Sequence, residues 1–466
     1  MKRFLLLLLI LTCMPLFAGA VDRPNLIVFL ADDLGYGDLG CFGHPVIKTP
    51  HLDAFAEEGV RLTQCYSASA VCSPSRSAIL TGRTPYRNGV FTWIAEGAEV
   101  HLRRSEVTLP SLLREAGYTT CHSGKWHLNG LFNDPAQPQP GDHGYDWWLA
   151  TQNNAAPSHE NPVNFVRNGE PVGAMEGYSA PLVVGEAIAW LRNERDPGKP
   201  FYLAVWTHEP HYPIKSDPDF KALYPDLSDE LQAEHHANVT QLDHAFGDLM
   251  KALDEEGLRE DTLVFFTSDN GPEGDGVKSP GRGSQGDLRG RKRDLHEGGI
   301  RVPGLARWPG KIPAGSLCDE PVIGSDLFPT LVKLGGASLP ENRVIDGVDV
   351  SGLLTGGAAR VERPQPLFWR LEMAPNAQYA MRVDEWKILA DAKLSGFELY
   401  NLKSDPREVE DLKEREPGRF LEMKTRLIRH NAAVEAEGPD WWKRLNPSGG
   451  KPKGSEGGKG KKVRQP

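Results

Sequence analysis

Four apolar runs that each stop at polar side chains constrain the fold of this sequence most. The first, NLIVFLADD, spans residues 25–33 and has the continuous β-branched and aromatic composition of a strand buried on both faces. Similar runs begin near residues 117, 201 and 262. The residues that end the four runs are acids, an amide, a lysine and histidines: Asp32 and Asp33, Lys125 and His127, His208 and His211, and Asp269 and Asn270.

Helical patterns separate these runs. Segments 50–58, 109–116 and 243–256 carry apolar residues at helical spacing, and each is followed by glycine. Strands that alternate with helices are typical of an α/β fold with a central, mostly parallel sheet flanked by helices. Because ligands of such sheets bind beyond the carboxyl ends of the strands, we expect a functional site where the four runs end.

The last part of the chain has a different pattern. From about residue 364, short segments alternate like antiparallel strands, and an amphipathic helix follows near 418–434. We therefore expect a large N-terminal domain over 21–363 and a smaller C-terminal α+β subdomain with a short antiparallel sheet over 364–445. The basic, Gly- and Lys-rich residues 446–466 lack apolar side chains to bury and are predicted to be disordered.

The N-terminus has the parts of a secretory signal peptide: Lys2 and Arg3, a short apolar run, and small residues up to Ala20. We predict a signal peptide over 1–20, cleavage after Ala20, and a secreted or periplasmic mature chain. The apolar run is shorter than the ~20 residues of a membrane span, and no other segment predicts a transmembrane helix. Lipid anchoring at Cys13 is the less favoured interpretation, because Thr12 precedes it where a smaller residue is expected.

Charge and cysteine content argue against two classes of protein. The formal net charge of −10 argues against general nucleic-acid binding. Six cysteines, five of them after the predicted cleavage, do not make a disulfide framework in a chain of 466 residues. Because five is an odd number, at least one thiol stays unpaired.

One of these cysteines, Cys72, begins the stretch CSPSRSAILTGR. Ser73 followed by Pro74 is typical of a helix start, with Ser73 as the capping residue. Cys72 would then lie at a helix N-terminus, where backbone N–H groups favour anions, and Arg76 would offer donors to an oxyanion one turn later. These residues alone leave the choice open between a low-pKa thiolate and a phosphate or sulfate site.

The stretch resembles the signature of type I sulfatases, C-x-P-S-R followed by an apolar pair and T-G. LADDLGYGD, GKWHL, PHYP, TSDNG, RKRDLHEGGIRVP and LYNLKSDP agree in order, so the resemblance covers roughly residues 22–435. It implies an alkaline-phosphatase-like α/β sandwich with a small C-terminal subdomain. It also implies that a formylglycine-generating enzyme oxidises Cys72 to formylglycine (3-oxoalanine), whose gem-diol attacks a sulfate ester.

The resemblance further implies the roles of the strand-end residues. The metal ligands would be Asp32, Asp33, Asp269, Asn270 and an oxygen of modified residue 72. Such an all-oxygen set suits one Ca²⁺ ion rather than zinc. The other catalytic groups would be Arg76 on the diol, Lys125 and Lys292 on the sulfate, His127 in the elimination step, and a histidine that protonates the leaving oxygen. Both His208 and His211 fit that last role, and we favour His211.

Loop residues around this site predict the substrate class. Asn153, Asn154, His208 and Arg291 are candidate substrate contacts, with Arg289, Arg293, Trp147 and Trp148 nearby. Amides, arginines and tryptophans favour a sulfated saccharide over an apolar ester, in the manner of arylsulfatase and N-acetylgalactosamine-6-sulfatase-like bacterial carbohydrate sulfatases. Two alternatives stay open: a phosphoester or phosphonate hydrolase of the same superfamily, and a non-catalytic binder of sulfated glycans with unmodified Cys72.

Overall fold

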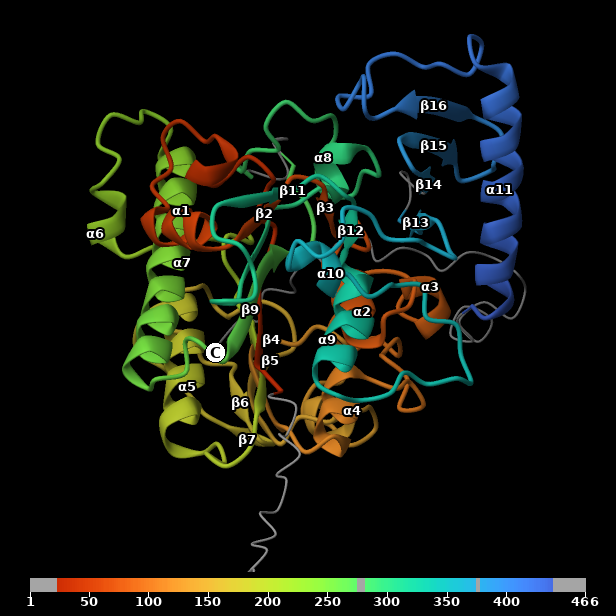
Figure 1. Ribbon diagram of the computed structural model, residues 1–466. Helices are drawn as coiled ribbons and strands as arrows, with labels where there is room; N and C mark the ends of the chain where they lie inside the picture. Colours follow the sequence, from red (N-terminus) through yellow and green to blue (C-terminus); the bar gives the residue numbers. More distant parts are fainter. Residues whose placement is uncertain (1–22, 275–280, 374–377, 439–466) are drawn as a thin grey trace, which may run out of the picture.

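The computed structural model describes residues 23–274, 281–373 and 378–438. The predicted signal peptide, Cys13 and the basic tail lie outside the described residues. Helices cover both faces of a large central sheet, and a smaller sheet with a long helix lies beside this layered body (Figure 1). This arrangement is the alkaline-phosphatase-like fold that the sequence predicts.

The large sheet has ten described strands, and its central strands are parallel. Across the sheet the order is β11 (Ser316–Cys318), β2 (Val60–Leu62), β10 (Gly304–Arg307), β9 (Thr262–Ser268), β1 (Asn25–Ala31), β8 (Phe201–Trp206), β4 (Thr119–Lys125), β5 (Trp147–Thr151), β6 (Val166–Arg167) and β7 (Glu170–Pro171). The four predicted strands therefore lie side by side as β9, β1, β8 and β4.

Residues of β1 alternate between two hydrophobic cores. Ile27 and Phe29 pack in a core formed with α1 (Pro50–Glu58), α5 (Ser179–Asn193) and α7 (Glu230–Glu255). Leu26, Val28 and Leu30 pack in the core on the other face. Helices α2 (Cys72–Thr81), α4 (Leu109–Glu115) and α9 (Leu327–Leu334) cover that face (Figure 1). Burial on both faces explains why β1 is an unbroken apolar run.

Short elements connect the main ones. They are β3 (Cys65–Tyr66), β12 (Val322–Ile323), α3 (Pro85–Asn88), α6 (Pro218–Lys221), α8 (Glu297–Ile300), α10 (Ser351–Leu354) and the 3₁₀ turns η1 (Gly40–Phe42), η2 (Pro140–His143) and η3 (Gly324–Asp326). Among the described residues, no helix has the length and the hydropathy that a membrane span requires.

The C-terminal part is a four-stranded antiparallel sheet packed against one long helix. Its elements are β13 (Leu367–Leu371), β14 (Gln378–Val383), β15 (Trp386–Asp391), β16 (Phe397–Asn401) and α11 (Pro417–Ala436). This matches the predicted α+β pattern. The predicted domain boundaries stay predictions, and contacts cross residue 363: Trp369 Nε1 of β13 donates to the carbonyl oxygen of Ser67 at 2.8 Å.

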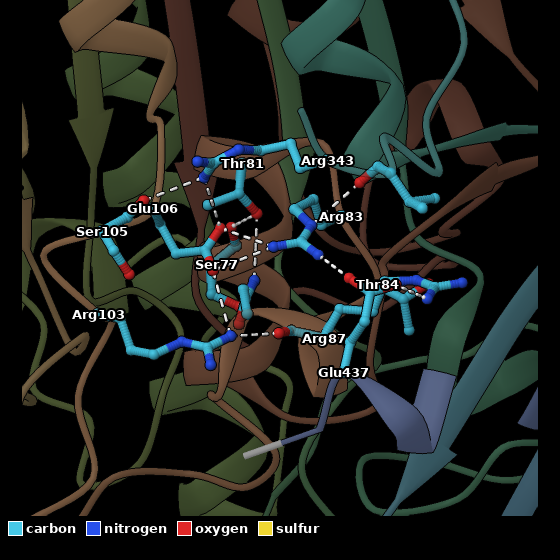
Figure 2. A network of polar contacts seen from close by, with 12 residues as sticks. Ser77, Thr81, Arg83, Thr84, Arg87, Arg103, Ser105, Glu106, Arg343 and Glu437 are labelled. Atoms are coloured by element: carbon cyan, nitrogen blue, oxygen red, sulfur yellow. Dashed lines mark hydrogen bonds and ion pairs between the residues drawn. The ribbon is translucent and has the colours of Figure 1, made fainter. Parts of the chain in front are cut away.

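A network of arginine and glutamate side chains joins the end of α11 to the segment after α2. Arg83 donates to both carboxylate oxygens of Glu106, at 3.1 and 3.0 Å, and Glu437 accepts from Arg83 and Arg87 (Figure 2). Arg103 and Arg343 reach the same Glu106 carboxylate. The network therefore connects residues more than 300 positions apart, and we call it the Glu106 network.

Candidate active site

The ends of four adjacent strands bring together the polar residues that the sequence singles out. Asp32 and Asp33 follow β1, Asp269 and Asn270 follow β9, and Lys125 ends β4. All five are buried, with at most 2% of each residue exposed. Because β9, β1, β8 and β4 are neighbours, parallel pairing alone places these side chains at one edge of the sheet.

Helix α2 adds Cys72 and Arg76 to this edge. The helix begins at Cys72 and not after Ser73, so the prediction that Ser73 caps it is wrong. The Ser73 hydroxyl instead accepts a hydrogen bond from the Ile94 amide at 3.1 Å. Cys72 thus lies in the first turn, where free N–H groups favour an anion.

Arg76 connects two of the acidic residues. Its Nη2 lies 2.7 Å from Asp269 Oδ2 and 3.7 Å from Asp32 Oδ2. Its Nη1 donates to the carbonyl oxygen of Lys125 at 2.9 Å, and the guanidinium lies over the ring of Trp206. The side chain is completely buried, so these contacts fix its position.

Two lysines neutralise the paired carboxylates. Lys125 Nζ lies 2.6 Å from Asp32 Oδ2, and Lys292 Nζ lies 2.7 Å from Asp33 Oδ2. Asn270 Nδ2 donates to Asp33 Oδ1 at 2.7 Å. The lysines and Arg76 therefore line the same small volume as the acids.

The oxygen atoms of this edge fit a hard cation. Ligand atoms of Asp32, Cys72 and Asp269 lie within 4.8 Å of one another, as do those of Asp32, Asp33 and His211. Within the described residues, Asp32 Oδ1 and Asn270 Oδ1 are buried without a hydrogen-bond partner. Buried oxygens without a donor are costly unless a cation or water satisfies them. The donor set is dominated by carboxylate and amide oxygens, which Ca²⁺ prefers.

The pKa values of the two acids beside Arg76 shift in opposite directions. Burial alone would raise the pKa of Asp32, but Lys125, His211 and Arg76 together hold it well below its usual range. Burial, and then the charge of Asp32, raises the pKa of Asp269. Two carboxylates this close resist simultaneous ionisation unless another cation offsets them.

Cys72 does not have the properties of a thiolate. Burial raises the pKa of its thiol, and Lys125 and Lys292 oppose that rise without reversing it. A neutral thiol is a weak nucleophile. Of the two readings that the sequence leaves open, the structure favours an anion site over a reactive low-pKa cysteine.

The three candidate histidines differ in accessibility. His211 is the most exposed, with 15% of its side chain accessible, and its Nε2 lies 3.6 Å from Asp33 Oδ2. His208 is completely buried and its Nε2 lies 2.8 Å from Thr151 Oγ1. His127 is buried, and its Nε2 contacts the carbonyl oxygen of Ile94 at 3.0 Å. Accessibility favours His211 as the group that meets a leaving oxygen.

The arginines around Lys292 have partners in the protein. Arg291 Nη1 donates to the carbonyl oxygens of Glu273 and Gly283, at 2.9 and 2.8 Å. Arg289 Nη1 donates to the Tyr400 hydroxyl at 3.0 Å. Arg293 pairs with Glu273. Substrate contact by Arg291 stays a prediction.

The predicted saccharide contacts lie at different depths. Asn154 Nδ2 donates to the carbonyl oxygen of Tyr212 at 3.3 Å, next to His211, and the Asn153 carbonyl accepts from Thr151. Their role stays a prediction. Trp148, which the sequence analysis places near these contacts, is only 6% exposed and packs in the core, so its ring offers no face to a sugar.

Glu273 is a site residue that the sequence analysis missed. It lies 3.2 Å from Lys292 Nζ, four residues after Asp269. Its sequence context, NGPEG, has the composition of an exposed turn. Only the tertiary fold shows that it meets a buried lysine.

Comparisons with known proteins identify the family of this chain. The family model described as Sulfatase matches residues 24–337, and that described as N-sulphoglucosamine sulphohydrolase, C-terminal, matches residues 290–432. The chain is 35% identical to N-acetylgalactosamine-6-sulfatase of Rattus norvegicus over 77% of this chain and 71% of the relative. It is 38% identical to arylsulfatase A of Bos taurus over 72% and 69%, respectively.

Solved structures give the same result. The PsFucS1 sulfatase from Pseudoalteromonas sp. matches with a TM-score of 0.76 and 26% identity over 90% of this chain and 91% of that one. Ps i-CgsB in complex with k-i-k-neocarrahexaose matches with a TM-score of 0.79 and 26% identity over 89% and 93%. With the strand-end acids, Cys72 and the cationic side chains in one place, these matches show that the chain belongs to the sulfatase family of sulfuric ester hydrolases.

Proposed function

We propose that this sulfatase removes sulfate from a saccharide ester with a formylglycine formed from Cys72 and one Ca²⁺ ion. The observation that carries the proposal is the position of Cys72: it is buried in the first turn of α2, and its ligand atom lies within 4.8 Å of those of Asp32 and Asp269. Formylglycine there would supply a gem-diol nucleophile, and Ca²⁺ would offset the charges of the acids and the sulfate. Its ligands would be Asp32, Asp33, Asp269, Asn270 and residue 72.

The cations of this chain would hold the sulfate group. Arg76, Lys125 and Lys292 are buried cationic residue types beside the strand-end acids, where a sulfate oxygen would bind. Burial lowers the pKa of Lys292, but the charges of Asp33 and Glu273 outweigh it and raise that pKa. Lys292 therefore stays protonated and serves as a donor, not as a base.

Two histidines would move protons. His211 would give a proton to the leaving oxygen, because it is the accessible histidine beside Asp33. Burial, then the charge of Lys292, lowers its pKa to about 4, so a bound sulfate would have to raise that pKa for the imidazole to donate a proton. His127 would take a proton from residue 72, since burial keeps it uncharged and its Nδ1 has no partner among the described residues.

The saccharide class rests on polar groups near His211. Asn153 and Asn154 carry amide oxygens that are buried and lack a partner in the described part of the chain, and such groups suit sugar hydroxyls. N-acetylgalactosamine-6-sulfatase and the complex with k-i-k-neocarrahexaose are carbohydrate-related, whereas steryl-sulfatases are among the other relatives. We further propose that the chain is exported, on the strength of its N-terminal pattern.

The phosphonate hydrolase alternative has weaker support. Phosphonate monoester hydrolase of Agrobacterium radiobacter shares the fold at a TM-score of 0.59 and 21% identity. A likeness of that size concerns the fold alone. A non-catalytic binder would have an unmodified Cys72. Mass spectrometry of the peptide that contains Cys72 therefore distinguishes a binder from the proposed enzyme.

Mass spectrometry of the peptide spanning Cys72, together with rates on sulfated saccharides and a simple aryl sulfate, tests the proposal. We expect the mass loss that converts cysteine to formylglycine, and the highest kcat/KM on a saccharide. An unmodified Cys72 in fully active protein would refute the proposal that formylglycine is the nucleophile. A higher kcat/KM on the aryl sulfate than on every glycosaminoglycan and algal saccharide would overturn the substrate class.

A further inference from the structure

We propose that Lys387 and Glu408 of the C-terminal part are positioning residues that hold Lys292 in the active site. This inference rests on the proposed role of Lys292. We call residues 289–297 the lysine loop. Lys292 lies within it, and its Nζ contacts Asp33 and Glu273 at 2.7 and 3.2 Å.

The lysine loop has little regular structure of its own. Residues 289–296 belong to no described helix or strand. Two backbone hydrogen bonds attach its middle to the catalytic part: Lys292 N–H donates to Pro272 and Arg293 N–H to Ala70, at 3.0 and 2.9 Å. Arg293 has a φ of 73°, which a non-glycine residue adopts only when its surroundings impose it. The loop therefore depends on contacts from outside.

A buried ion triad supplies the strongest of these contacts. Lys387 Nζ on β15 lies 2.9 Å from Glu297 Oε1 and 2.8 Å from Glu408 Oε1. Glu408 Oε2 also accepts a hydrogen bond from the Glu297 backbone N–H at 2.7 Å. All three side chains are completely buried. Removing one partner of such a cluster leaves an unpaired buried charge, which is strongly unfavourable.

Further contacts hold other positions of the same loop. His296 lies between Asp294 and Glu398 of β16, at 2.7 and 3.3 Å. At the start of the loop, Arg289 Nη1 donates to the carbonyl oxygen of Glu408 at 3.0 Å. Leu295 N–H donates to the Gln378 side chain of β14 at 3.1 Å. Three strands of the small sheet and the segment after them thus hold the loop on both sides of Lys292.

These anchors matter because a lysine side chain is flexible. Asp33 and Glu273 hold its ammonium, and the lysine loop sets the distance of the Lys292 backbone from these two partners. Lys292 is three residues from Arg289 and five from Glu297. A misplacement of about 1 Å in a catalytic group costs on the order of 10²-fold in rate. We therefore expect the C-terminal part to act on catalysis through Lys292, without touching the substrate.

A double-mutant cycle separates this role from a general loss of stability. Lys387→Met is expected to lower kcat/KM by roughly 10²-fold, and Lys387→Arg, which keeps the charge, to restore part of it. In a Lys292→Ala enzyme, Lys387→Met is expected to change the residual rate little, because its effect runs through the missing amine. Equal fold-losses from Lys387→Met in both backgrounds would overturn the proposal.

Two further variants keep the test decisive if Lys387→Met folds poorly. Glu408→Gln keeps an acceptor for the Glu297 N–H and removes one charge, so a smaller loss in the same direction is expected. Arg370→Met is the matched control: it removes a buried cation of the same sheet whose partners, Glu372 and Glu435, lie outside the lysine loop. A loss of kcat/KM in Arg370→Met as large as in Glu408→Gln would contradict positioning.

Hydrogen exchange tests the anchor without any sulfatase assay. In Glu408→Gln, faster exchange of the Lys292 and Arg293 amides, with unchanged exchange in β1, is expected. Unchanged exchange in the lysine loop would overturn the proposal. Absence of sulfatase activity in the wild type, with this exchange result intact, would instead refute the proposed function.

Discussion

Cys72 lies among charged side chains and yet keeps its proton, because burial outweighs Lys125 and Lys292 in setting its pKa. A buried neutral thiol attacks poorly. Cys72 is therefore better suited as the precursor of a modified residue, such as the proposed formylglycine, than as the nucleophile itself.

Replacement of Cys72 by serine is therefore expected to preserve the fold and remove nearly all turnover. The swap changes one atom, and a serine hydroxyl lacks the second oxygen that a gem-diol has for releasing sulfate. Steady-state kinetics and circular dichroism measure both effects. Cys65→Ser is the control, since Cys65 is also buried, at 2% exposure, but lies outside the site. Full multiple-turnover activity of Cys72→Ser would refute the proposed formylglycine mechanism.

Substitution of His211 by alanine should depend on the leaving group. We expect a loss of roughly 10²–10⁴-fold in kcat/KM for a saccharide sulfate, whose alkoxide needs a proton. The loss should be far smaller for 4-nitrophenyl sulfate, whose phenolate leaves unaided. His208→Ala serves as comparison, because a buried histidine that bonds Thr151 should affect both substrates alike. If His211→Ala lost kcat/KM equally on the saccharide sulfate and on 4-nitrophenyl sulfate, the role of His211 as the acid would be refuted.

Removal of metal is expected to abolish activity. The Asp32, Asp33, Asp269 and Asn270 oxygens suit Ca²⁺, so added Ca²⁺ should restore the rate better than Zn²⁺. Sulfatase activity is measured after exhaustive chelation and again after each metal is added. Elemental analysis checks the metal content of each sample. Unchanged activity in metal-free protein would show that these oxygens hold no catalytic cation.

At the scale of elements, the sequence predicts strands better than loops. The runs that become β1, β8 and β9 are buried on both faces, so their apolar composition identifies them, whereas β4, TTCHSGK, is buried but polar. Their shared edge then follows from parallel pairing. The Ser73 cap, the burial of Trp148 and the contact between Glu273 and Lys292 depend on packing between distant segments. Local patterns carry no information about such packing.

The contact of β16 with the lysine loop predicts a pH dependence of stability. Burial lowers the pKa of His296, but Asp294 and Glu398 outweigh it and raise the pKa to about 9, with Glu408 adding to them. An unfolded histidine titrates near ~6.5. The charged form is therefore favoured by folding, so this stabilisation is full below about pH 6.5 and is lost as the pH rises through about 9.

Urea unfolding of the wild type and His296→Gln at about pH 6 and about pH 10 checks this prediction. The difference in unfolding free energy between the two proteins should be larger at the lower pH. Arg289, near Glu398 at 3.8 Å, and Lys387 are cationic at both values and should not change the comparison. A difference that grows with pH would contradict the assigned direction.

At the scale of the whole molecule, the Glu106 network joins the last helix to the catalytic part. Glu106 and Arg83 have side chains only 4% and 6% exposed. Glu106→Gln would leave Arg83, Arg103 and Arg343 without their shared carboxylate, so a loss of about 3 kcal/mol in unfolding free energy is expected. Glu255→Gln breaks an exposed pair with Arg192 and should cost less than about 1 kcal/mol. Denaturant unfolding of both variants measures these two losses of unfolding free energy. Equal losses in Glu106→Gln and Glu255→Gln would contradict the prediction.

The depth of Cys72 also sets an order of events in biosynthesis. Only 4% of the residue is exposed, and α2 around it is buried along its whole length. An enzyme that oxidised Cys72, as proposed, would have to reach a thiol that the finished fold covers. The proposed conversion would therefore come before folding. Cells that fold the chain faster than they modify it would accumulate folded but inactive protein. The expression yield would then not predict the sulfatase activity of a preparation.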